Sequence, residues 1–145
     1  MKVLLAGGGT GGHVYPAIAI ANKIKEHNPD CEILFVGTKN GIESEIVPKA
    51  GFELKTVTVQ GFKRKIDFDN VKRVFKLCKG LEQSRRIVKK YKPDIVIGTG
   101  GYVSGPVLFN AAMSKKVTIV HEQNSFPGVT NKIRSKVATK VLTSF

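Results

Sequence analysis

Short apolar runs alternate along the chain with longer segments in which apolar residues recur every three or four positions. The short runs are almost continuously apolar, which is typical of parallel strands buried on both faces. They predict strands at residues 2–6, 33–37, 54–59, 94–98, 117–121 and 139–144. The longer segments predict helices at residues 16–26, 42–50, 70–90, 103–113 and 127–137. This alternation predicts an α/β fold, a doubly wound parallel sheet of Rossmann-like type with right-handed crossovers.

Two glycine-rich loops follow the first and fourth predicted strands. They span residues 7–13 (GGGTGGH) and 98–106 (GTGGYVSGP), and the fifth strand runs into residues 121–124 (HEQN). In a sheet with strand order 3-2-1-4-5-6, the first and fourth strands flank the point where the order reverses. Ligands bind there, beyond the carboxyl ends of the strands. We therefore expect these three loops to converge on one crevice.

Composition and charge narrow the class of protein. The 145 residues fit one domain, and 41% hydrophobic with 24% charged residues is a soluble globular composition. The net charge of +13 indicates an anionic partner, such as phosphate groups, nucleic acid or a lipid surface. The sequence shows neither a signal peptide nor an apolar run long enough for a transmembrane helix. Cys31 and Cys78 fit no zinc or disulfide pattern, so a reducing, cytoplasmic setting is expected.

The first glycine loop has two functional interpretations. Gly7, Gly9 and Gly12 match the G-x-G-x-x-G fingerprint of dinucleotide-binding domains. That fingerprint needs an acid near the end of the second strand, where this chain has Thr38 and Lys39. Because Lys39 could accept a 2′-phosphate, an NADP-binding oxidoreductase domain remains an alternative.

The other interpretation is a site for a phosphate or a sugar. Gly9, Gly11 and Gly12 let backbone N–H groups approach an anion at a helix N-terminus, and Thr10 adds a hydroxyl. The positive end of the helix disfavours a charged imidazole, so a neutral His13 would serve as a general base. The alternative for His13 is a capping or core histidine, which the glycine context makes the less favoured interpretation.

The second glycine loop follows the same logic. Gly100 and Gly101 permit close approach of a ligand, and Ser104 is expected to cap the following helix. Tyr102 is suited to stacking on a sugar ring, although packing under the loop would explain it equally well.

Polar residues after the fifth strand complete the candidate site. Glu122 can bond sugar hydroxyls or orient a base, and Asn124 offers both a donor and an acceptor. Asn131, in the next predicted helix, either reaches the crevice or is exposed. The Asp67–Asp69 pair superficially resembles a metal-binding DxD motif, but Asp69 fits a helix N-cap better, so no metal is predicted.

Residues 63–92 hold twelve Lys or Arg against three acids, and so contribute most of the positive charge. Val74, Leu77, Leu81, Ser84, Val88 and Tyr91 form the stripe expected to face the sheet. Other apolar residues lie among the cations, an arrangement that suits an anionic membrane surface. The predicted membrane-docking residues are Phe62, Lys63, Arg64, Lys65, Ile66, Phe68, Val71, Lys72, Phe75, Lys76 and Lys79. A solvated helix is the alternative, and no recognised nucleic-acid module is present.

Three segments together resemble the MurG family, glycosyltransferases of peptidoglycan synthesis that add N-acetylglucosamine (GlcNAc) to lipid I. They are residues 6–16 (AGGGTGGHVYP), 100–106 (GGYVSGP) and 121–131, which holds HEQN and GVTN. The resemblance spans the whole chain in order. It covers only the N-terminal, acceptor-binding domain of that family's two-domain GT-B architecture, so residues 1–145 would lack a C-terminal donor-binding domain.

The resemblance implies transfer of GlcNAc from UDP-GlcNAc to the muramoyl 4-hydroxyl of undecaprenyl-diphosphate-linked lipid I, with inversion, to give lipid II. It implies no cofactor or metal and no nucleic-acid partner. His13 would be the candidate base and Glu122 would orient or assist it, and the sequence leaves open which of the two takes the proton. Thr10, Gly11, Gly12 and Asn124 would reach the donor sugar, and the glycine loops would approach the acceptor diphosphate.

The location implied is peripheral, on the anionic cytoplasmic face of the plasma membrane. The piece alone is expected to be inactive, because the chemistry needs a cleft closed by the second domain. A non-catalytic membrane-surface adaptor is the remaining alternative. In that case His13 and Glu122 would be dispensable and the predicted membrane-docking residues would not.

Overall fold

The computed structural model describes residues 1–59, 68–122 and 140–143. The strands are Lys2–Gly7 (β1), Glu32–Gly37 (β2), Glu53–Thr56 (β3), Ile95–Gly100 (β4), Val117–Glu122 (β5) and Lys140–Thr143 (β6). The helices are Gly11–His27 (α1), Glu43–Lys49 (α2), Phe68–Tyr91 (α3) and Ser104–Met113 (α4). The helix predicted at residues 127–137 lies outside the described residues.

The strands form one sheet in the order β3-β2-β1-β4-β5-β6, and every neighbouring pair is parallel. The predicted strand order and the doubly wound fold are thus confirmed. The order reverses between β1 and β4, which are directly paired, as Leu4 with Val96. The carboxyl ends of these two strands carry the two glycine loops.

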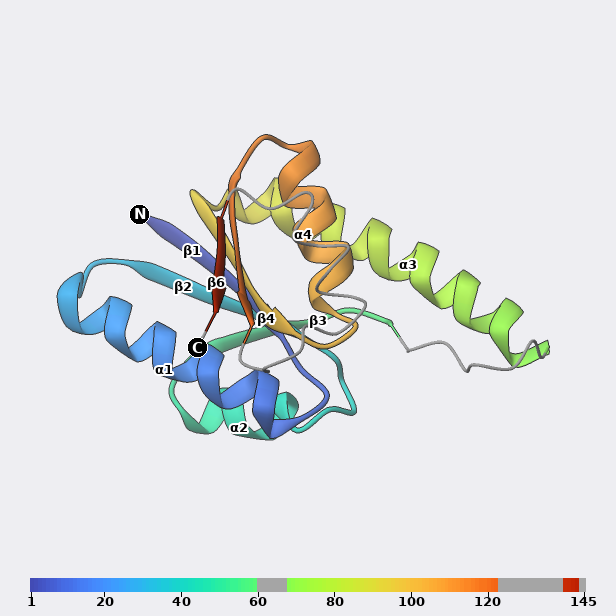
Figure 1. Ribbon diagram of the computed structural model, residues 1–145, viewed down its shortest axis with the longest axis horizontal. Helices are drawn as coiled ribbons and strands as arrows, with labels where there is room; N and C mark the ends of the chain where they lie inside the picture. Colours follow the sequence, from blue (N-terminus) through green and yellow to red (C-terminus); the bar gives the residue numbers. More distant parts are fainter. Residues whose placement is uncertain (60–67, 123–139, 144–145) are drawn as a thin grey trace.

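Helices cover both faces of the sheet, and each face has its own core (Figure 1). Side chains alternate along β1, so that Leu4 packs on the face covered by α3 and α4 while Leu5 packs on the face covered by α1 and α2. Both side chains are completely buried. Because both faces are covered, the strands read as continuous apolar runs in the sequence.

Among the described elements, two differ from their predicted bounds by three or more residues, and the others by one or two. Helix α1 begins at Gly11 rather than at residue 16, because the Thr10 carbonyl accepts hydrogen bonds from the N–H groups of His13 and Val14. Glycine is a poor helix former, so helix propensity alone favours a loop that continues through Gly11 and Gly12. Strand β3 ends at Thr56 rather than at residue 59, because the N–H of Thr58 turns from the sheet to donate to Gln83 Oε1 of α3, 2.6 Å away.

Candidate functional site

The two glycine loops meet at the carboxyl edge of the sheet, as the sequence predicted. The Gly8 N–H donates to the Gly100 carbonyl at 3.3 Å. Gly101 has φ +85°, and a Cβ there would overlap the Gly8 carbonyl oxygen. Only glycine therefore allows the backbones to approach this closely at Gly101. The contact fixes the position of one loop relative to the other.

A cavity of about 200 Å³ opens between the loops. Its walls come from the first loop and the start of α1, from the ends of β2 and β3, and from the second loop. The lining residues are Gly8, Gly9, Thr10, His13, Thr38, Val59, Gly101, Tyr102 and Val103. Three of these nine residues are glycines and two are threonines, and His13 is the one imidazole among them.

The His13 ring is held in one orientation by the first loop. Its Nδ1 lies 3.1 Å from the Gly8 carbonyl oxygen and 3.2 Å from Thr10 Oγ1. Because a carbonyl oxygen can only accept, the contact with Gly8 requires Nδ1 to carry the hydrogen. In the neutral ring Nε2 is then the nitrogen with a free lone pair, which is the atom that a general base needs.

The backbone of His13 is held by β4. Thr99, whose side chain is completely buried, donates its hydroxyl to the His13 carbonyl at 2.6 Å. Gly100 follows, with φ +125°, and a Cβ there would overlap the His13 ring at Cδ2. His13 is therefore placed by residues from both loops, and it is not fully buried.

The second loop corrects the prediction for Ser104 and excludes one of the two interpretations of Tyr102. Ser104 does not cap α4, because it lies inside the helix and its hydroxyl donates to the Gly101 carbonyl at 2.9 Å. Ser104 thus stabilises the loop from below. Tyr102 is 57% exposed and lines the cavity, so it is not packed under the loop.

The remaining predicted site residues have different positions relative to the cavity. Gly11 and Gly12 form the first turn of α1, directly after the lining residue Thr10. Glu122 ends β5, which pairs with β4, so its backbone lies at the same sheet edge as the glycine loops. The side chain of Glu122 and the whole of Asn124 and Asn131 lie outside what the structure describes.

Sequence reasoning missed one buried carboxylate next to the cavity. Glu43, the first residue of α2, is completely buried, and its Oε2 accepts from the Gly9 N–H at 3.1 Å. Its Oε1 accepts from both the N–H and the hydroxyl of Thr38, at 2.7 Å each. The feature that could have indicated Glu43 is an acid shortly after β2, a few residues beyond the position that the dinucleotide fingerprint prescribes. Glu43 accepts hydrogen bonds from Gly9 and Thr38 and does not line the cavity, so the ribose contact of that fingerprint is missing.

The apolar stripe predicted for α3 is buried along only part of the helix. Ser84 and Val88 are buried and Leu77 packs against the core, whereas Val74 is 49% exposed. Figure 1 shows why, because the end of α3 near Phe68 projects beyond the sheet. Val71 and Phe75 are exposed there, with Lys72 and Lys79 exposed beside them. Residues 62–66 and the side chain of Phe68 lie outside the described part of the chain.

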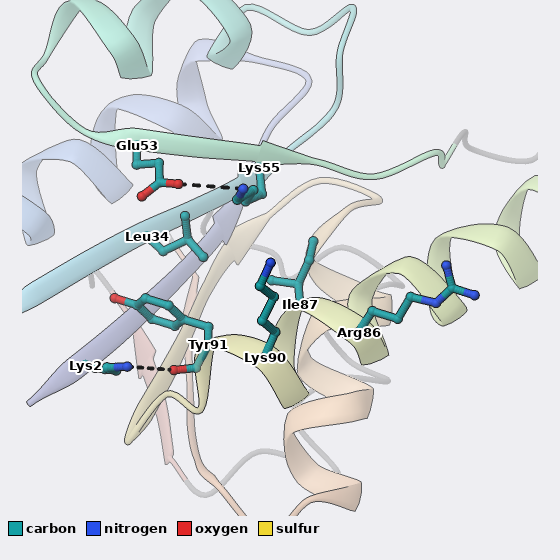
Figure 2. Close-up of a pocket in the computed structure, with 8 residues that line it drawn as sticks. All are labelled: Lys2, Leu34, Glu53, Lys55, Arg86, Ile87, Lys90 and Tyr91. Atoms are coloured by element: carbon teal, nitrogen blue, oxygen red, sulfur yellow. Dashed lines mark hydrogen bonds and ion pairs between the residues drawn. The ribbon is translucent and has the colours of Figure 1, made fainter.

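A larger cavity, of about 380 Å³, lies away from the glycine loops. Figure 2 shows Ile87, Lys90 and Tyr91 of α3 facing Leu34 of β2 and Lys55 of β3 across this groove. It is near the beginnings of β1 and β3, not their carboxyl ends. Burial together with nearby carboxylates raises the pKa of Tyr91 to about 12. The groove holds a cationic rim but none of the predicted site residues.

Two further observations concern the described residues only. None of the helices there is both long enough and apolar enough to cross a membrane. No group of three or more His, Cys, Asp or Glu side chains comes together there in a way that would hold a metal ion.

Comparison with known proteins places this arrangement in a family. Residues 3–143 match the N-terminal domain of glycosyltransferase family 28. The chain belongs to this family. It is 85% identical over all 145 residues to the UDP-N-acetylglucosamine–N-acetylmuramyl-(pentapeptide) pyrophosphoryl-undecaprenol N-acetylglucosamine transferase of Clostridioides difficile strain 630. It is 57% identical over the same length to the transferase of that name from Thermoanaerobacter sp. strain X514.

Two solved structures share the fold of this chain. The crystal structure of Acinetobacter baumannii MurG is 32% identical, with a TM-score of 0.85 over 99% of this chain and 41% of that one. The glycosyltransferase SsfS6 of Streptomyces sp. SF2575, 14% identical with a TM-score of 0.64 over 94% of this chain and 44% of that one, shares the fold alone. The chain spans 36% of the C. difficile relative and 40% of the Thermoanaerobacter one. Membership of a glycosyltransferase family removes the ground for the oxidoreductase interpretation.

Proposed function

We propose that this chain is the acceptor-binding part of an enzyme that transfers GlcNAc from UDP-GlcNAc to the muramoyl 4-hydroxyl of undecaprenyl-diphosphate-linked lipid I. The observation that carries the proposal is the 85% identity, along the entire chain, to the C. difficile transferase. The site geometry supports it, because two of the three motifs of the MurG resemblance, the glycine loops, line one cavity with a histidine in its wall.

In the proposed reaction, His13 Nε2 takes the proton of the acceptor 4-hydroxyl. The acceptor oxygen forms a bond to the anomeric carbon of GlcNAc while the bond from that carbon to the UDP oxygen breaks. Attack from the face opposite UDP inverts the configuration. The contact of Nδ1 with the Gly8 carbonyl, at 3.1 Å, supports this role because it leaves Nε2 as the basic nitrogen.

The remaining site residues would bind the substrates. Thr10, Gly11, Gly12 and Asn124 would reach the donor sugar, and Glu122 would orient or assist the base. Gly9, Gly100, Gly101, Tyr102, Ser104 and Asn131 would complete the binding surface. Gly9 would contribute shape rather than its N–H group, since Glu43 already accepts that hydrogen.

The exposed end of α3 would dock on the cytoplasmic face of the membrane, where a polyprenyl-linked acceptor resides. Phe75 is 72% exposed and is flanked by lysines on the same helix. Apolar side chains among cations fit the boundary between anionic headgroups and acyl chains. The other proposed partner is the second domain of the complete enzyme, which would carry most of the donor site.

The test uses a chimaeric enzyme, defined as the C. difficile relative with this chain in place of its own matching segment. Transfer of labelled GlcNAc to a soluble short-chain lipid I analogue is measured. His13→Asn retains an N–H near the position of Nδ1 but removes Nε2, so we expect transfer to fall about 10²- to 10⁴-fold. His27→Asn, at the exposed end of α1, is the matched control. Absence of transfer by the unsubstituted chimaera would overturn the proposal.

A further inference from the structure

We infer that Glu43 is a positioning residue, which holds the loop Gly8–Thr10 so that His13 keeps its working orientation. The inference rests on the proposed function for its effect on the reaction. The structural part of the inference is that a buried carboxylate restrains the loop. This part depends only on the contacts of Glu43.

The surroundings of Glu43 are built to enclose a carboxylate. The side chain is 0% exposed, and three glycines lie against it: Gly8, Gly37 and Gly41. A Cβ at any of the three would overlap Glu43. The loop after β1 and the segment from the end of β2 to α2 thus both give up side-chain volume around one carboxylate. A glutamate is seldom completely buried unless its oxygens are satisfied by partners.

The carboxylate connects two walls of the cavity. Oε2 accepts from the Gly9 N–H in the loop after β1, and Oε1 accepts from Thr38 at the end of β2. Gly9 and Thr38 both line the cavity. Glu43 itself does not, so it acts from behind the walls and sets the distance between them.

A short chain of contacts leads from Glu43 to the reacting nitrogen. Gly9 is bonded to the carboxylate, and the preceding residue, Gly8, presents its carbonyl to His13 Nδ1. Gly9 has φ +90° and nothing within 4 Å of the position a Cβ would take. Among the described residues, no neighbouring group therefore packs against the loop on that side of Gly9. The hydrogen bond to Glu43 supplies a restraint at that point, and with it a fixed direction for the Gly8 carbonyl.

This arrangement needs a side chain with two oxygens that accept hydrogen bonds. Each carboxylate oxygen of Glu43 accepts from a different backbone N–H, and one also accepts from the Thr38 hydroxyl. A glutamine of the same shape has only one oxygen, so its NH₂ group would face either Gly9 or Thr38, donor against donor. Glu43→Gln therefore releases one wall while nearly preserving the volume.

The test compares Glu43→Gln with Glu45→Gln in the chimaeric enzyme. Glu45 lies on the same helix, where its exposed carboxylate pairs with Lys49. For Glu43→Gln we expect kcat per folded molecule to fall about tenfold to hundredfold, as a displaced catalytic group would produce, with KM for UDP-GlcNAc within about twofold. Amide hydrogen exchange in the peptide containing Gly9 should accelerate. Glu45→Gln should change neither quantity.

The outcomes separate the two proposals. Unchanged kcat and unchanged exchange in folded Glu43→Gln overturn the positioning role while leaving transferase activity in place. If the unsubstituted chimaera transfers no GlcNAc, the proposed function fails, and faster exchange at Gly9 still supports the structural part. If Glu43→Gln does not fold, Thr38→Val removes one of the three donors. A lowered kcat at unchanged KM then supports the role, and an unchanged kcat overturns it.

Discussion

Two features of Gly100 favour glycine at this position: its backbone conformation and its close contact with the His13 ring. Its φ of +125° lies in a region that L side chains rarely adopt, and a Cβ would overlap the His13 ring. Gly51 has a comparable φ of +88°, but nothing lies within 4 Å of the position a Cβ would take. Comparing substitutions at Gly100 and Gly51 therefore separates the energetic cost of a side chain at positive φ from the effect on the His13 ring.

We expect Gly100→Ala and Gly51→Ala each to lower the free energy of unfolding of the chimaeric enzyme by about 1–3 kcal/mol, from the positive φ. Only Gly100→Ala should also displace the imidazole, lowering GlcNAc transfer about 100-fold per folded molecule. Denaturant unfolding and the transfer assay measure the two effects. Equal transfer by the two variants at equal folded fraction would show that Gly100 does not set the position of His13.

At the residue scale, the sequence predicted His13 and missed Glu43, for a physical reason. His13 stands in a glycine-rich segment between a strand and a helix, a local pattern that indicates a ligand loop. The role of Glu43 depends on the pairing of β1 with β2, which brings Gly8 and Gly37 around it. No local spacing in the sequence indicates that burial. The dinucleotide fingerprint concerns an acid only at the end of β2, where a ribose contact would need it.

Helix α3 changes its environment along its length. Towards Tyr91 it packs on the sheet, whereas towards Phe68 it projects beyond the sheet and exposes apolar side chains (Figure 1). The periodicity of the sequence predicted one continuous buried stripe. It could not show where the underlying sheet ends, because that limit depends on strands elsewhere in the sequence and not on the helix itself.

This exposed end gives a prediction for membrane binding. Phe75→Ser removes a phenyl ring that is 72% exposed among lysines, while Phe109→Ser removes one that is 48% exposed on α4. We expect Phe75→Ser to weaken binding of the chimaeric enzyme to anionic phospholipid vesicles about tenfold, from the lost apolar insertion. Phe109→Ser should leave binding unchanged. Co-sedimentation with the vesicles measures both, and an equal effect of the two variants would argue against docking through α3.

At the scale of the whole molecule, the strand order brings distant segments to one edge. The loops after β1 and β4 meet because these strands pair in parallel at the point where the order reverses. Alternating apolar runs and glycine loops were enough to predict this convergence. The start of α1 was not predictable in the same way, because contacts between the two loops outweigh the low helix propensity of Gly11 and Gly12.

The extent of the chain bears on whether it can act alone. The cavity at the glycine loops has a volume of about 200 Å³, below the roughly 300–1,000 Å³ typical of pockets that enclose a small ligand. The proposed reaction must hold two substrates, a nucleotide sugar and a lipid-linked sugar, and exclude water from the bond being formed. The chain also spans only 36% of the C. difficile relative.

We therefore expect the isolated 145-residue chain to show no GlcNAc transfer above the uncatalysed background, even when circular dichroism shows it folded. The chimaeric enzyme, which restores the rest of the relative's length, should transfer under the same conditions. The comparison uses equal molar concentrations and the same lipid I analogue. Measurable turnover by the isolated chain, abolished by His13→Asn, would mean that the described domain already contains a complete donor site and that closure by a second domain is not required.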